Sequence, residues 1–138
     1  MSEANKQLLQ RWFDEVWNHG RVEGIDEMFA GDGIAHGLAD ETGNPLRGPE
    51  NFRVYHSQMR TAFPDIVVNV EDMVAEGDKV AARCSVRGKH GGDSFGVAAT
   101  QTPVEFTGMT IVRIQNGKIV EAWNNFDFMK MYRQIGVL

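Results

Sequence analysis

The chain has 138 residues, of which 42% are hydrophobic and 24% charged, as expected for a globular protein with a single core. Its net charge of −5 is spread along the chain without a basic cluster, which argues against nucleic acid or an anionic membrane as a partner. The single cysteine, Cys84, excludes an intramolecular disulfide and offers no metal-ligand spacing. Because there is no apolar segment of membrane-spanning length and no signal peptide, we expect a cytoplasmic protein.

The N-terminal segment predicts an amphipathic helix over residues 3–18. Leu8, Trp12 and Val16 recur at intervals of four, and a second apolar row lies beside them, so one broad face of the helix is hydrophobic. Gly20 follows the last apolar position and is expected to end the helix. This face needs a partner surface elsewhere in the chain.

Two further helices are predicted in the first half of the chain. The apolar spacing repeats over a shorter stretch, residues 22–29, with Gly31 as its stop. A short strand over 33–38 follows. A third helix is expected over 48–63, because Pro49 stands at its first turn and an acidic residue comes next.

After the third helix the apolar period changes from 3.6 to 2. Residues 66–71 and 80–87 alternate between apolar and mostly polar positions, which is typical of antiparallel strands with one solvated face. Residues 88–102 are rich in glycine and have few apolar anchors. They predict a long functional loop, which we expect to be the most mobile internal segment.

The C-terminal part predicts a long β-hairpin over residues 103–126, followed by a short helix. Two β-branched runs flank Asn116-Gly117, the strongest short hairpin signal, and Gly108 marks a bend or bulge in the first arm. Helices first and strands after indicate an α+β fold, with helices packed on the concave face of a curved antiparallel or mixed sheet. We expect one domain over residues 1–138.

The sequence is compatible with two registers of the hairpin. A two-residue turn pairs Thr110 with Trp123 and puts Asn124 on the opposite face from Thr110. A three-residue turn with a bulge at Gly117 pairs Thr110 with Ala122 and puts Thr110 and Asn124 on one face. In that register the shared face is apolar apart from these two, and comprises Phe106, Gly108, Thr110, Val112, Val120, Ala122, Asn124 and Phe126. We predict the second register because such a face suits a ligand pocket.

Six short segments occur in the same order as in a known protein family. They are residues 17–20 (WNHG), 47–50 (RGPE), 63–65 (FPD), 76–80 (EGDKV), 117–123 (GKIVEAW) and 134–136 (QIG). With these segments the chain resembles the SnoaL-like polyketide cyclases, which share the cone-shaped fold of nuclear transport factor two. The resemblance covers nearly the whole chain. It is specific for the fold but weak for the reaction, since the superfamily also includes isomerases, hydrolases and binding proteins.

The resemblance implies an intramolecular aldol ring closure that uses neither metal nor cofactor. The family's acid/base aspartate lies seven positions after the turn glycine, where this chain has Asn124, and its histidine seven positions before that glycine is Thr110 here. An amide can hold an oxygen by hydrogen bonding but cannot take a proton from carbon. The family's loop histidine is matched by His90, and its acidic residue before the last helix by Asp127.

The candidate catalytic residues are therefore His36, His90 and Asp127, each with a structural alternative. His36 could be a partly exposed strand histidine, His90 a solvated loop histidine, and Asp127 the cap of the last helix. His56 lies on an apolar helical face and is interpreted as a core histidine. The candidate ligand-binding residues are Asn124, Thr110, Trp123, Phe106 and Phe126, and for the three aromatic residues the structural alternative is a place in the core.

These observations lead to one functional hypothesis and one alternative. The hypothesis is a pocket protein without metal or cofactor that acts on an apolar carbonyl compound by proton abstraction and enolate stabilisation. The alternative is a non-catalytic member that binds a small ligand or serves as a dimeric interaction module. We also expect a homodimer formed through the outer face of the sheet, where Arg83, Ser85 and Arg87 would lie.

Overall fold

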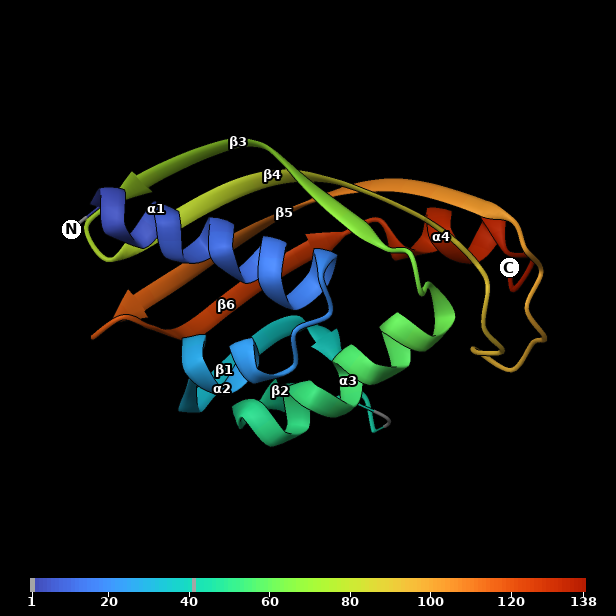
Figure 1. Cartoon of the computed structure of the whole chain (residues 1–138), viewed down its shortest axis with the longest axis horizontal. Coiled ribbons are helices and arrows are strands. Elements are labelled where there is room, and N and C mark those ends of the chain that lie inside the picture. The colour runs from blue at the N-terminus through green and yellow to red at the C-terminus, as the bar shows by residue number, and fades with distance from the viewer. Residues whose placement is uncertain (1, 41) are drawn as a thin grey trace.

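The computed structural model describes residues 2–40 and 42–138 and shows a curved, open six-stranded sheet packed against helices (Figure 1). The strands are β1 (Phe29–Ala39), β2 (Pro45–Arg47), β3 (Val67–Glu76), β4 (Lys79–Lys89), β5 (Pro103–Gln115) and β6 (Lys118–Phe126). The helices are α1 (Ser2–Arg11), the π-helical segment η1 (Trp12–Asn18), α2 (Glu23–Met28), α3 (Gly48–Ala62) and α4 (Phe128–Gln134). The predicted α+β class is confirmed.

The sheet has the order β2-β1-β6-β5-β4-β3 and is mixed. β1 and β6 run parallel, and the other neighbouring strands are antiparallel. The long strands β3, β4 and β5 arch over α1 in Figure 1, so the helices fill the concave side. In the described ranges no helix is both long and apolar enough to cross a membrane.

The predicted helix over residues 3–18 is continuous but changes its geometry at Trp12. The last seven residues form η1, whose wider turns bury Trp12 and Trp17 in the core. At its end the Asn18 side chain bonds Val68 of the edge strand β3 twice: Nδ2 donates to the carbonyl oxygen (3.0 Å), and Oδ1 accepts from the amide (2.6 Å). The helix is thereby fixed to the sheet edge.

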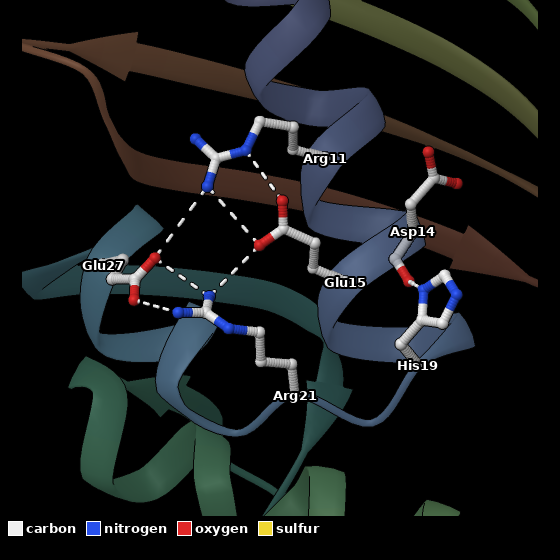
Figure 2. A network of polar contacts seen from close by, with 6 residues as sticks. All are labelled: Arg11, Asp14, Glu15, His19, Arg21 and Glu27. Carbon is white, nitrogen blue, oxygen red and sulfur yellow. Dashed lines mark hydrogen bonds and ion pairs between the residues drawn. The ribbon is translucent and has the colours of Figure 1, made fainter.

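A surface network of charged side chains ties α1 and η1 to α2 (Figure 2). Glu15 accepts from Arg11 at 2.9 Å and from Arg21 at 3.1 Å, and Arg21 also pairs with Glu27 at 2.5 Å. These side chains are 30–52% exposed, so water and salt screen the pairs and they add little stability.

The boundary between α2 and β1 differs from the sequence prediction. The helix ends at Met28, and Phe29 already has extended dihedrals (φ −104°, ψ 126°), so Gly31 lies inside β1 rather than ending a helix. The strand is longer than the predicted 33–38 because it pairs with β6 at Phe29 and again over residues 34–36, and with β2 at Ala39. Pairing between strands that are far apart in the chain leaves no signal in the local sequence pattern.

The hairpin has a two-residue turn, so the predicted three-residue turn is wrong. Gln115 pairs with Lys118, and both turn residues have positive φ (53° and 73°), as a type I′ turn requires. The extra residue lies in the second arm instead. Ile114 pairs with Ile119 and Arg113 with Glu121, so Val120 is left unpaired as a bulge.

The bulge nevertheless puts the predicted residues on one face. Thr110 pairs directly with Asn124, not with Ala122 or Trp123, and both side chains point to the concave side. Gly108 pairs with Phe126, and a Cβ on Gly108 would lie 2.2 Å from the Phe126 ring. Glycine is therefore required there for Phe126 to fold over the strand.

Candidate functional site

The concave side of the sheet and the helices enclose a largely apolar cavity. The centres of water-sized molecules have about 70 Å³ of space in it. Its lining consists of Leu9, Trp12, Phe13, Trp17, Phe29, Ala35, Leu38, Phe52, Tyr55, Met59, Ile66, Val68, Val86, Phe106, Thr110, Val112, Ile119, Ala122, Asn124, Phe126 and Phe128. Among these described residues there is no Asp, Glu, His, Lys, Arg or Cys. The wall of the cavity is therefore uncharged and mostly apolar.

Thr110 and Asn124 are the polar pair of the sheet wall. Thr110 is 2% exposed, and its Oγ1 has no hydrogen-bond partner among the described residues. Asn124 Nδ2 donates to the His36 carbonyl oxygen at 2.9 Å, across the parallel pair of β6 and β1. A buried polar atom without a partner is rare and costly in a folded protein, so Thr110 is a candidate contact for a ligand.

Gly37 lets β1 approach Asn124 closely. Its φ is +81°, and a Cβ at this position would lie 1.8 Å from the Asn124 carbonyl oxygen. No other residue type fits there without a backbone shift. The side-chain amide of Asn124 is therefore held on a rigid frame.

Tyr55, on α3, is a polar lining residue that is not among the site residues predicted from the sequence. Its ring packs edge-on against Trp17 (centroids 6.2 Å apart) and Phe52 (6.1 Å). Burial, and secondarily the neighbouring Tyr132, raise the pKa of the Tyr55 phenol well above its usual range. Tyr55 therefore stays neutral and can donate a hydrogen bond but cannot serve as a base at neutral pH.

His36 and Trp123 lie on the outer face of the sheet, so the expectation that they line the pocket is wrong. They are opposite each other in the parallel pair of β1 and β6, and their rings stack with centroids 5.8 Å apart. Their neighbours Ala35 and Asn124 point inward, and successive strand residues alternate between faces. His36 Nε2 bonds a carboxylate oxygen of Glu121 at 2.7 Å.

Glu121 joins this outer cluster to the hairpin. Its carboxylate bonds His36 and also Arg113, which lies opposite it on β5. The hydrogen bond from His36, followed by the charge of Arg113, lowers the pKa of Glu121 below its ordinary value. The cluster fastens three neighbouring strands on the face away from the cavity.

His90 is fully buried, so the alternative that it is a solvated loop histidine is wrong. Its Nδ1 bonds Thr100 Oγ1 at 3.0 Å and its Nε2 bonds Ser94 Oγ at 2.8 Å, while its ring packs against Phe63 and Phe95. β4 extends to Lys89, which shortens the predicted loop to residues 90–102. His90 thus holds this loop together and does not line the cavity.

Asp127 caps α4, as the structural alternative proposed. Its Oδ1 accepts a hydrogen bond from the Lys130 amide at 3.1 Å. The residue borders a hollow on the outer face of the sheet, beside Asn125 and Thr107, and not the cavity. None of the three candidate catalytic residues therefore lines the cavity, whereas four of the five ligand-binding candidates do: Asn124, Thr110, Phe106 and Phe126.

His56 is a core histidine, as interpreted from the sequence. It is 3% exposed, its Nε2 lies 2.6 Å from the Val16 carbonyl oxygen, and its ring packs on Trp17. Since a carbonyl only accepts, Nε2 carries the proton. Burial is the main cause that lowers the pKa of His56, so the neutral imidazole holds α3 against η1.

The fold and cavity together define a class: an α+β cone whose sheet and helices surround an apolar cavity. The sequence matches the SnoaL-like polyketide cyclase family over residues 7–135, so the chain belongs to this family. Within the described part of the chain no group of three or more His, Cys, Asp or Glu residues is placed to hold a metal ion.

Characterised relatives and solved structures agree with this assignment. Aklanonic acid methyl ester cyclase DauD from Streptomyces sp. (strain C5) is 29% identical over 131 residues, which are 93% of this chain and 80% of DauD. DnrD from Streptomyces peucetius, with the same described activity, is also 29% identical, with 93% and 88% covered. The crystal structure of IdmH from Streptomyces antibioticus has a TM-score of 0.83 at 31% identity, with 96% and 98% covered.

Proposed function

We propose that this protein binds an apolar, uncharged, oxygen-bearing small molecule of the polyketide kind inside the cone. One observation carries the proposal: in a cavity whose described helical side has one hydroxyl group, the neutral Tyr55 phenol, two polar side chains, Thr110 and Asn124, stand side by side on the sheet wall. Apolar walls supply the affinity, and a few placed polar groups fix the orientation. Phe106 and Phe126 would contact the flat part of the ligand.

The activity named for the relatives suggests ring closure as the reaction, but the described lining of this cavity lacks a base for it. Ring closure of the aldol type begins with removal of a proton from carbon. The described lining has neither a carboxylate nor an imidazole for this step. We therefore propose that Thr110 and Asn124 hold and polarise an oxygen of the ligand, and that His36, His90 and Asp127 take no part in proton transfer within the cavity.

A non-catalytic ligand-binding protein is the second candidate function, and the missing base favours it. The two candidates share the same binding step, so binding is tested first. Trp12 and Trp17 line the cavity and report on it, whereas Trp123 lies outside and is removed by Trp123→Phe. Titration of this variant with naphthol should quench its fluorescence in a saturable way.

A cavity-filling variant distinguishes internal from surface binding. Ala122→Leu adds side-chain volume to the cavity wall, and Ala81→Leu adds the same volume on the outer face of β4. The first should abolish saturable quenching, and the second should leave it unchanged, with circular dichroism confirming that both are folded. Equal binding by the two variants would contradict the proposal.

A further inference from the structure

Thr110 and Asn124 face each other across the hairpin without bonding to each other. They are direct cross-strand partners, whose Cβ atoms are typically about 5 Å apart. Thr110 Oγ1 is nevertheless unpartnered, and no described residue donates to Asn124 Oδ1. The pair thus leaves a gap with polar atoms on both sides.

The orientation of the Asn124 amide is set by β1. The His36 carbonyl can only accept, so Nδ2 must be the atom that faces it. β6 lies between β1 and β5, so Thr110 stands across β6 from the strand that the amide nitrogen binds. With Nδ2 engaged by β1, Oδ1 is the atom of the amide left to accept a hydrogen bond.

We infer that the gap between Thr110 and Asn124 recognises a neutral hydroxyl group, phenolic or enolic, on an apolar ring. A hydroxyl oxygen can accept from Thr110 while its proton is donated to Asn124 Oδ1, so one group satisfies both atoms. An ether or ketone oxygen cannot donate, and a carboxylate finds no cation in the described lining. This inference rests on the proposed function and narrows its ligand class.

A matched ligand pair tests the inference. In the Trp123→Phe background, naphthol should bind about tenfold more tightly than its methyl ether, which keeps the acceptor and loses the donor. In Asn124→Leu, which removes the acceptor Oδ1, the difference should fall below about twofold. Thr110→Val should weaken the binding of both compounds and keep the difference, and Thr110→Ser should bind both as the parent does. The control Thr107→Val, three residues away and exposed on the outer hollow, should leave both affinities unchanged.

Stability gives a second, independent readout. Thr110→Val removes an unpaired buried hydroxyl at nearly constant volume, so the ligand-free protein should melt at a higher temperature while naphthol binds more weakly. A hydroxyl that only supports the fold would give a lower melting temperature.

The outcomes separate the inference from the proposed function. Equal affinity for naphthol and its ether in the parent protein would overturn the inference alone, as would a difference that persists in Asn124→Leu. If neither compound binds the folded protein, the proposed function fails and the inference fails with it.

Discussion

At the scale of single residues, Asn124 decides what chemistry the cavity can perform. The family resemblance implies an acid/base aspartate at this position, and the Nδ2 of Asn124 is bonded to the His36 carbonyl. A carboxyl group placed there by Asn124→Asp would face that carbonyl in an apolar cavity. Both surroundings favour its neutral form, so we expect its pKa to lie above the ordinary value of about 4.

The pH dependence of stability measures this shift. For an acid whose pKa is raised by folding, the unfolded chain ionises first, so stability is lost as pH rises above the unfolded pKa of about 4. The melting temperature of Asn124→Asp should therefore fall, relative to the parent protein, between about pH 4 and pH 7. A difference that stays constant over this range would show that residue 124 does not face the cavity.

Gly37 is the second residue with a specific requirement. Gly37→Ala places a Cβ against the Asn124 carbonyl oxygen at a positive φ, and should cost about 1–3 kcal/mol or more. Gly43→Ala is a matched control, because its φ is also positive (+84°) but its surroundings are open. Chemical denaturation of the two variants should show the larger loss for Gly37→Ala, and equal losses would contradict the close approach of β1 to β6.

At the scale of elements, His56 links α3 to η1 in its neutral form. Because folding lowers its pKa, the unfolded chain binds the proton first as the pH falls below about 6.5. Stability should therefore decrease from about pH 7 towards pH 5. His56→Gln should weaken this dependence in thermal melts, and an unchanged slope would argue against the buried neutral histidine.

The loop over residues 90–102 is tied by His90 yet has few apolar anchors. We still expect it to exchange its amide protons faster than β5, since polar contacts at a surface open more easily than a central strand. His90→Ala should speed exchange further at Gln101, whose amide bonds the His90 carbonyl in the intact loop. Exchange as slow as in β5 would show that the loop is part of the rigid frame.

The hairpin shows what the sequence could and could not predict. The shared face of Thr110 and Asn124 was predictable because side chains alternate between the two faces of a strand. One extra residue anywhere in the hairpin between them puts both on the same face. The place of that residue was not, since Val120 looks like any other strand residue. The face of His36 was also hidden, because it depends on the long-range parallel pairing of β1 with β6.

At the scale of the whole molecule, we expect two copies to pair through the outer face of the sheet. Val74, Met109 and Ile111 are 45–63% exposed there, which is unusual for large apolar side chains of strands. Arg83 and Arg87 are exposed on β4, so the contact would be mixed in polarity. Light scattering at micromolar concentration should give the mass of a dimer, and a monomer would remove this expectation.

The charged side chains of Figure 2 lie on the surface, and none of them lines the cavity. Arg21→Ala removes both the contact to Glu15 and the contact to Glu27. Because these groups are exposed, the variant should bind naphthol as the parent does and lose little stability, with the small effect vanishing at high salt. A large loss of binding would show that the position of α2 controls the cavity.

The central claim is that the ligand binds inside the cone, and nuclear magnetic resonance of the labelled protein tests it most directly. During a naphthol titration the Asn124 side-chain amide and the methyl groups of Thr110 and Ala122 should shift, because they line the cavity. The methyl groups of Met109 and Ile111, exposed on the outer face, should stay in place. Shifts confined to Met109 and Ile111, or no shifts at all, would contradict the account.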